Sequence, residues 1–96
     1  MAAQGTTTVD FGAFPGDTYV TVAVTGQTGI LAGSLVEAWI IPATTADHSV
    51  DEHVVDAPVI RAGNVVAGTG FTIYASAPRD GEGQYWGQWN VGWVWN

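Results

Sequence analysis

Apolar and polar residues alternate in short runs along most of the chain. In the clearest run, 19–25, Val20, Val22 and Val24 fall on one face, with tyrosine, threonine and alanine on the other. A period of two residues is typical of a β-strand that buries one face. The other runs of this kind are 6–11, 34–41, 53–60, 64–67, 70–76 and 88–96. The pattern predicts an all-β protein with six to eight short strands.

Turn signals separate these runs. Thirteen glycines and four prolines punctuate the chain, and a cluster such as Phe14-Pro15-Gly16-Asp17 favours a tight turn. The segments 42–51 and 78–87 predict loops, and no segment predicts a helix longer than one turn. Because 96 residues suit one hydrophobic core, we predict a single domain, 1–96. Its fold class is a small antiparallel β-sandwich, jelly-roll-like in style.

The strand predicted at 34–41 is largely apolar on both faces, because Trp39 and Ile41 accompany Glu37 on the face opposite Val36. Two apolar faces suit a strand in the centre of a sheet, or one whose outer face is covered by a second subunit. We expect the strands that begin near residues 19, 34, 70 and 88 to be central. The side chains expected in the core are those of Val20, Val22, Val24, Trp39, Phe71, Ile73, Val91 and Trp93. For Trp39 and Trp93, the alternative is contact with a partner subunit.

The charge balance excludes several classes of partner. The chain has nine acidic residues, two arginines and no lysine, for a net charge of −7. So few cations cannot neutralise the phosphates of a nucleic acid or attract an anionic membrane. Charged residues make up only 11% of the chain, against about 25% in ordinary domains, which suggests that part of the surface is covered. With no cysteine, stability rests on packing and, we expect, on oligomerisation.

Targeting signals are not evident in the sequence. The first residues lack the basic and apolar regions of a secretory signal, and no apolar run reaches the length of a membrane-spanning helix. We therefore expect a protein made in a cytoplasm that is kept there or released without a signal.

Tryptophan is the most informative residue type. Four of the five tryptophans, Trp86, Trp89, Trp93 and Trp95, lie in the last eleven residues. Trp89, Trp93 and Trp95 share one strand face, a larger aromatic set than one small core comfortably holds. We predict that Trp86, Trp89 and Trp95 contribute to a subunit interface, where tryptophan is a favoured anchor. The alternatives are a sugar-stacking platform or a core of unusual aromatic content.

The densest polar cluster is 47–53, with two histidines and three carboxylates. These side chains are possible metal ligands. His48 and His53 are five residues apart, however, which places them on one face of neither a helix nor a strand. We predict a structural or interface loop without a metal. The alternative is a metal clamp on a three-fold axis, where symmetry-related histidines converge.

Signals of catalysis and cofactor binding are weak. The chain contains no phosphate-binding loop that opens a helix and no Gly-x-Ser-x-Gly turn. Asp51 and Glu52 are paired acids of the kind that glycosidases use, but a chain this short builds a deep sugar cleft with difficulty. We predict no catalytic residue, no cofactor and no enzymatic activity.

Much of the sequence resembles a group of short bacteriophage and prophage proteins of uncharacterised role. The segments that carry the resemblance are 6–16, 35–40, 45–53, 68–74 and 93–96. The resemblance implies a virion protein made in the host cytoplasm, such as a capsid decoration or cement protein, or a small fibre or tail component. Its expected partners are further copies of itself and other virion proteins.

The strand number, the Gly-Phe-Thr-Ile run at 70–73 and the ending Trp93-Val94-Trp95 are also similar to the H-type lectin domain. That domain is a small six-stranded sandwich that forms trimers, so the similarity implies a homotrimer. It also leaves open an alternative function, recognition of host surface glycans, with tryptophans as stacking platforms and the 47–53 segment supplying hydrogen bonds.

Overall fold

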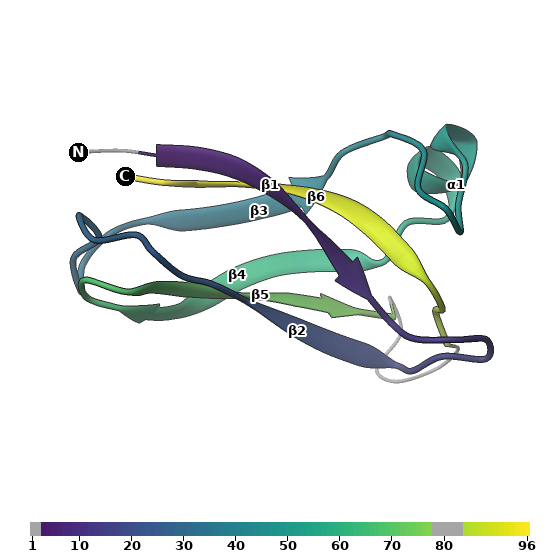
Figure 1. Ribbon diagram of the computed structural model, residues 1–96, viewed down its shortest axis with the longest axis horizontal. Coiled ribbons are helices and arrows are strands. Elements are labelled where there is room, and N and C mark those ends of the chain that lie inside the picture. The colour runs from purple at the N-terminus through teal and green to yellow at the C-terminus, as the bar shows by residue number, and fades with distance from the viewer. Residues whose placement is uncertain (1–2, 78–83) are drawn as a thin grey trace.

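The computed structural model describes residues 3–77 and 84–96, which form two three-stranded antiparallel sheets packed face to face (Figure 1). The first sheet has the order β1-β6-β3, and the second has the order β2-β5-β4. The prediction of a small antiparallel β-sandwich is confirmed. The strands are β1 (Ala3–Asp10), β2 (Tyr19–Val24), β3 (Val36–Ile40), β4 (Val59–Val66), β5 (Gly70–Ser76) and β6 (Gln88–Trp95).

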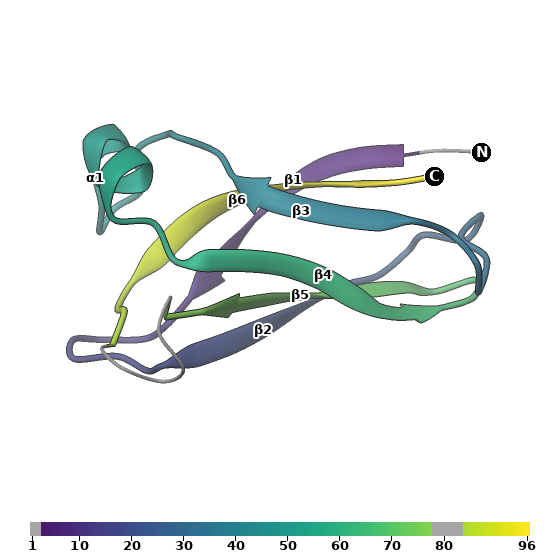
Figure 2. The same ribbon diagram turned by 180° about the vertical axis from the view of Figure 1, so that it is seen from behind.

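A short helix, α1 (Val50–Val55), lies at one end of the sandwich, and the start of β1 and the end of β6 lie at the other (Figures 1 and 2). We call these the α1 end and the terminal end. The helix is a correction, because the sequence predicted a loop over 42–51 and a strand beginning at 53. The strand starts only at Val59, after Pro58, and runs through a bulge that joins the two short runs predicted at 53–60 and 64–67.

No helix within residues 3–77 and 84–96 is long and apolar enough to cross a lipid bilayer.

The core is dominated by the inward face of β6, where Trp89, Val91, Trp93 and Trp95 alternate as predicted. The prediction that Trp89 and Trp95 lie at a subunit interface is wrong, because these side chains are only 1% and 2% exposed within the single chain.

Small neighbours create the space for this aromatic face. Trp93 is flanked in the sheet by Gly5 on one side and Ala38 on the other. A Cβ atom at Gly5 would lie only 2.4 Å from the Trp93 ring, so the ring occupies the volume that a side chain on β1 would need. An aromatic-rich core therefore fits a chain of this size.

The remaining predicted core residues are buried or partly buried. Val24, Phe71, Ile73, Val91 and Trp93 are buried, whereas Val20 and Val22 are partly buried against the core. Only β5 and β6 are central, so the prediction of central positions for β2 and β3 is wrong.

Trp39 is the clear exception among the predicted core residues. It lies on the outer face of β3 and is 43% exposed. There its ring covers Gly92 of β6, where an added Cβ would approach ring carbons to about 2.9 Å.

Candidate functional site

The loop before α1 is fastened to β6 by polar side chains. The hydroxyl of Thr45 donates to the carbonyl of Gln88 at 2.9 Å and accepts from the backbone N–H groups of Asp47 and His48. The carboxylate of Asp47 accepts from the Gln88 N–H at 2.8 Å. These bonds bring the predicted 47–53 cluster against the start of β6, so the cluster has a defined geometry.

The helix begins with a reciprocal capping box. The Ser49 side chain accepts from the Glu52 N–H at 3.2 Å, and the Glu52 carboxylate accepts from the Ser49 N–H at 2.9 Å. Each bond satisfies a backbone donor that the first turn would leave free. The pattern Ser-x-x-Glu is a sequence signature of a helix start, and it was the signal that could have revealed α1 where polar composition alone predicted a loop.

His48 is buried between two hydrogen-bond acceptors. Its Nε2 lies 2.6 Å from the carbonyl oxygen of Trp86, and its Nδ1 lies 2.8 Å from a carboxylate oxygen of Glu52. A carbonyl and a carboxylate both accept, so the geometry fits an imidazole ring that carries a proton on each nitrogen. When the ring carries both protons, its positive charge pairs with the carboxylate of Glu52. The His48 ring also stacks on Trp89, with ring centroids 4.0 Å apart.

The ring of His53, in contrast to that of His48, lies between one hydrogen-bond acceptor and one donor. Its Nδ1 lies 2.8 Å from the carbonyl oxygen of Ser49 and must donate, whereas its Nε2 accepts from the Asn90 N–H at 3.1 Å. One donor and one acceptor define a neutral ring with the proton on Nδ1. The ring is 1% exposed and lies beside Trp89, with centroids 5.0 Å apart.

The two histidines therefore serve the fold. All four of their ring nitrogens have partners within the chain, which leaves no lone pair for a metal. Among residues 3–77 and 84–96, no group of three or more histidine, aspartate or glutamate side chains is arranged to hold a metal ion. The three-fold metal clamp considered from the sequence conflicts with this geometry, because it needs an outward-facing imidazole.

Two side chains at this end have shifted pKa values. The pKa of Glu52 is lowered from 4.5, mainly by the hydrogen bond with His48 and then by that with the Ser49 backbone. The pKa of Tyr85 is raised from 10.0, first by burial and then by the negative charge of Asp56. The Tyr85 hydroxyl donates to the carbonyl of Ala57 at 3.1 Å and so helps to hold the segment after α1.

Catalytic use of the His48–Glu52 pair has no support in the geometry. The pair has the residue types of an acid–base dyad, but His48 is 4% exposed and both of its nitrogens are occupied. Asp51 and Glu52, the paired acids of the sequence, lie in the first turn of α1. Glu52 is taken up by the capping box and by His48, so the two carboxylates do not face a common substrate.

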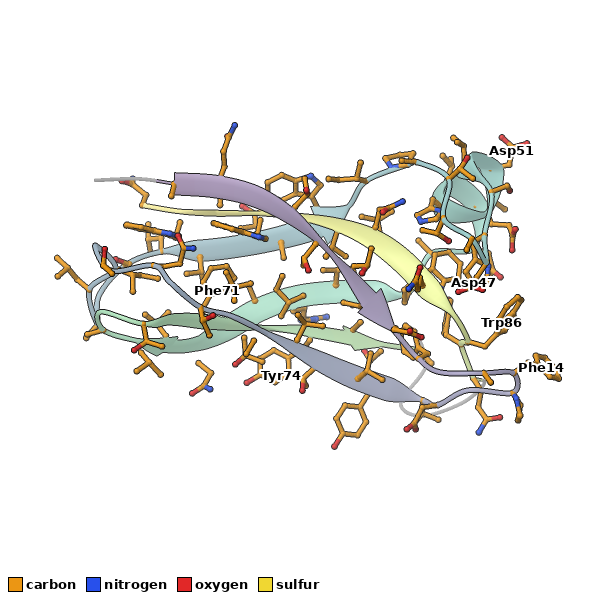
Figure 3. All side chains as sticks on the ribbon, viewed as in Figure 1. Phe14, Asp47, Asp51, Phe71, Tyr74 and Trp86 are labelled. Carbon is orange, nitrogen blue, oxygen red and sulfur yellow. The ribbon has the colours of Figure 1, made fainter. Side chains whose placement is uncertain are left out.

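An open pocket of about 350 Å³ lies beside this cluster. Its main side-chain walls are Asp10 at the end of β1, Phe14 from the β1–β2 connection, Asp47 from the loop before α1, and Trp86 from the segment that leads into β6. Figure 3 shows Asp47, Trp86 and Phe14 in succession along the α1 end. Of the three tryptophans predicted at an interface, only Trp86 keeps a partly exposed side chain.

Sequence reasoning identified Trp86 and Asp47 but missed Asp10 and Phe14. These two residues are more than thirty positions away in the chain from Asp47. Only the pairing of β1 with β6, which matches Asp10 with Gln88, brings them to the same place. The turn signal at 14–17 predicted the turn itself but not what it would face.

Comparison of the chain with protein-family models, with curated proteins and with solved structures finds no match.

Proposed function

We propose that this domain is a structural component of a bacteriophage virion, either a capsid decoration or cement protein or a small fibre or tail component. It acts through contacts between subunits, as a homotrimer that also binds other virion proteins, and it has no catalytic role. The sequence resemblance supports the virion setting. The outer face of the β1-β6-β3 sheet supports the role in assembly.

That face carries the proposal because β3 is an edge strand of its own sheet. The two apolar faces of β3 suited either a central position or cover by a second subunit, and the central position is now excluded. Trp39, 43% exposed above Gly92, is the aromatic anchor of the face. Its neighbours are mainly uncharged, with Thr6 of β1 paired to Gly92 of β6 and Ile41 beside the ring, and Glu37 is the charged residue exposed on the same face of β3. A face with few charges lets identical acidic chains meet with little repulsion.

Sedimentation of the wild type and of two matched variants tests the proposal. Trp39→Ala removes the anchor, and Tyr74→Ala removes a comparably exposed aromatic side chain from the outer face of the other sheet, at 39% exposure. We expect the wild type and Tyr74→Ala to sediment as trimers and Trp39→Ala to sediment as a monomer. A wild type that stays monomeric at micromolar concentration would contradict the assembly role.

A second candidate function, glycan recognition, is favoured by the same face. Next to Trp39 lies a hollow of about 420 Å³ lined by Thr6, Thr7, Thr8, Ile41, Ala43 and Asn90. Hydroxyl and amide groups beside an exposed indole suit a neutral sugar, whose apolar face stacks on the ring while its hydroxyls form hydrogen bonds. A glycan array separates the two functions. Dose-dependent binding to defined sugars that Trp39→Ala abolishes would favour recognition over assembly.

A further inference from the structure

The pocket at the α1 end combines two carboxylates with two aromatic rings. The carboxylates belong to Asp10 and Asp47 and the rings to Phe14 and Trp86, around a volume of about 350 Å³. The pocket shares no lining residue with the hollow beside Trp39, and Trp39 itself does not line it, so variants of the two sites test the two inferences independently.

Both carboxylates are held in place by the backbone. One oxygen of Asp10 accepts from the Gly12 N–H at 2.8 Å, and one oxygen of Asp47 accepts from the Gln88 N–H at 2.8 Å. Within residues 3–77 and 84–96, the second oxygen of each carboxylate accepts no hydrogen bond. Each acid therefore presents a positioned acceptor whose orientation is already fixed before a ligand arrives.

The two rings form a corner beside these acceptors. The Phe14 and Trp86 centroids are 6.2 Å apart and the ring planes meet at 80°. Phe14 is 76% exposed, so its ring is open to a ligand. Aromatic faces attract a cation through their quadrupole, and the effect is largest on tryptophan. Rings and carboxylates together match an organic cation with an apolar stem.

The charge distribution points to the same ligand. Six of the seven carboxyl side chains in residues 3–77 and 84–96 lie at this end, on Asp10, Asp17, Asp47, Asp51, Glu52 and Asp56. The remaining one, Glu37, lies on β3, nearer the terminal end. His48 pairs with Glu52 at 2.8 Å, and Arg61 lies on β4, in the other sheet. A second copy of the chain would bring like charges together, which disfavours self-contact here.

We propose that this pocket binds an arginine or lysine side chain of a basic partner protein. The two free carboxylate oxygens receive the N–H donors, and the Phe14–Trp86 corner covers the cation and its methylene stem. The contact is to a folded or extended segment of another protein that carries a basic residue at an exposed position.

A titration with a blocked peptide tests the site directly. The probe is acetyl-Gly-Arg-Gly-amide, its lysine counterpart is a second probe, and a citrulline peptide is the uncharged control. In ¹H–¹⁵N spectra of the full chain, we expect the arginine peptide to shift the Trp86 indole and Gly87 amide signals, with the lysine peptide weaker and the citrulline peptide without effect. Equal shifts from the citrulline peptide, or none from the arginine peptide, would overturn the proposal.

Two charge-matched double variants separate a pocket from general attraction. Asp10→Asn with Asp47→Asn keeps an oxygen to accept each backbone N–H, and we expect it to weaken arginine-peptide binding by about tenfold or more. Asp51→Asn with Asp56→Asn removes the same charge from the same end outside the pocket, and should retain most of the affinity. Equal losses in the two variants would show that net charge alone attracts the peptide.

A third variant keeps the test decisive if the Asp10/Asp47 pair fails to fold. Phe14→Ala changes a side chain that is largely in solvent, so the fold should be retained while binding falls by several-fold. Unchanged binding in a folded Phe14→Ala protein would rule out the aromatic corner as part of the site.

Discussion

The two ends of the sandwich are built by the same strands but are held in different ways. At the α1 end, the loop and helix are fixed by side chains: Thr45 and His53 form hydrogen bonds with β6, and His48 with Trp86 just before it. At the terminal end, backbone bonds between Leu35 and Asn96 close the edge. The main side-chain contact there joins the Trp95 indole N–H to Gln27 at 2.9 Å.

The two ends also differ in charge and in the exposure of apolar side chains. The α1 end holds most of the carboxylates, whereas the terminal end exposes apolar side chains such as Leu31 and Leu35, at 69% and 75%. The comparison shows that one end depends on particular polar residues and the other on chain pairing and packing. Substitutions that remove similar groups at the two ends should therefore have unequal effects.

The largest difference is expected between the two buried tryptophans. Trp89 contacts His48, His53 and Tyr85 through its ring, and its indole N–H donates to the Trp86 carbonyl at 3.2 Å. We expect Trp89→Ala to cost about 4–5 kcal/mol, enough to unfold a marginal domain, and Trp95→Ala about 3 kcal/mol. Urea denaturation followed by circular dichroism measures both. Equal losses of stability would contradict the proposed difference between the two ends.

A smaller difference should follow from removing one hydrogen-bonding partner at each end. His53→Leu leaves the Asn90 N–H without its acceptor inside the structure, at an expected cost of about 2–3 kcal/mol. Gln27→Ala leaves the buried Trp95 indole N–H without its acceptor, but truncation of the half-buried Gln27 side chain opens space that water can enter, and should cost about 1 kcal/mol. Chemical denaturation gives both values, and the reverse order would contradict the assigned neutral role of His53.

A serine-to-alanine substitution at each end should show the same contrast, with smaller losses of stability. Ser49→Ala removes the helix cap at the α1 end and should cost about 1 kcal/mol. Ser34 accepts from the Leu31 N–H at an exposed turn of the terminal end, and Ser34→Ala should change stability by less than about 0.5 kcal/mol. Thermal unfolding of both variants checks the contrast. A cost for Ser34→Ala as large as that for Ser49→Ala would show that both turns depend on their serines.

The weakest effect is a dependence on acid pH that originates at the α1 end. Because the folded chain lowers the pKa of Glu52 below 4.5, the ionised carboxylate stabilises the fold above that pH. This contribution is lost as the pH falls through the lower pKa of the folded state. We expect the melting temperature of the wild type to drop more than that of Glu52→Gln between about pH 5 and pH 2. If the melting temperatures of the two proteins fall in parallel with pH, Glu52 does not contribute to the loss of stability in acid.

The contrast also explains where sequence-based prediction worked. Strand alternation is a local property, so the runs at 19–25, 70–76 and 88–96 predicted β2, β5 and β6 well. The helix was not predicted because a six-residue element is too short to show a helical period of apolar residues, although the Ser49–Glu52 capping signature was present. Trp39 was placed inside on its apolar character, but side-chain type does not specify on which side of an edge strand the core lies.

The fold class, the absence of cysteine-based stabilisation, the acidic balance and the inward face of β6 all follow from the amino-acid sequence alone. Composition and the two-residue period of a strand are properties of residues that are neighbours along the chain. The burial of Trp89 and Trp95 and the exposure of Trp39 depend instead on the packing of the whole chain, since the small residues that make room for the rings, such as Gly5, lie on other strands. Tertiary packing alone places Asp10 and Phe14 beside Asp47 and Trp86, because strand pairing joins segments that no local pattern connects.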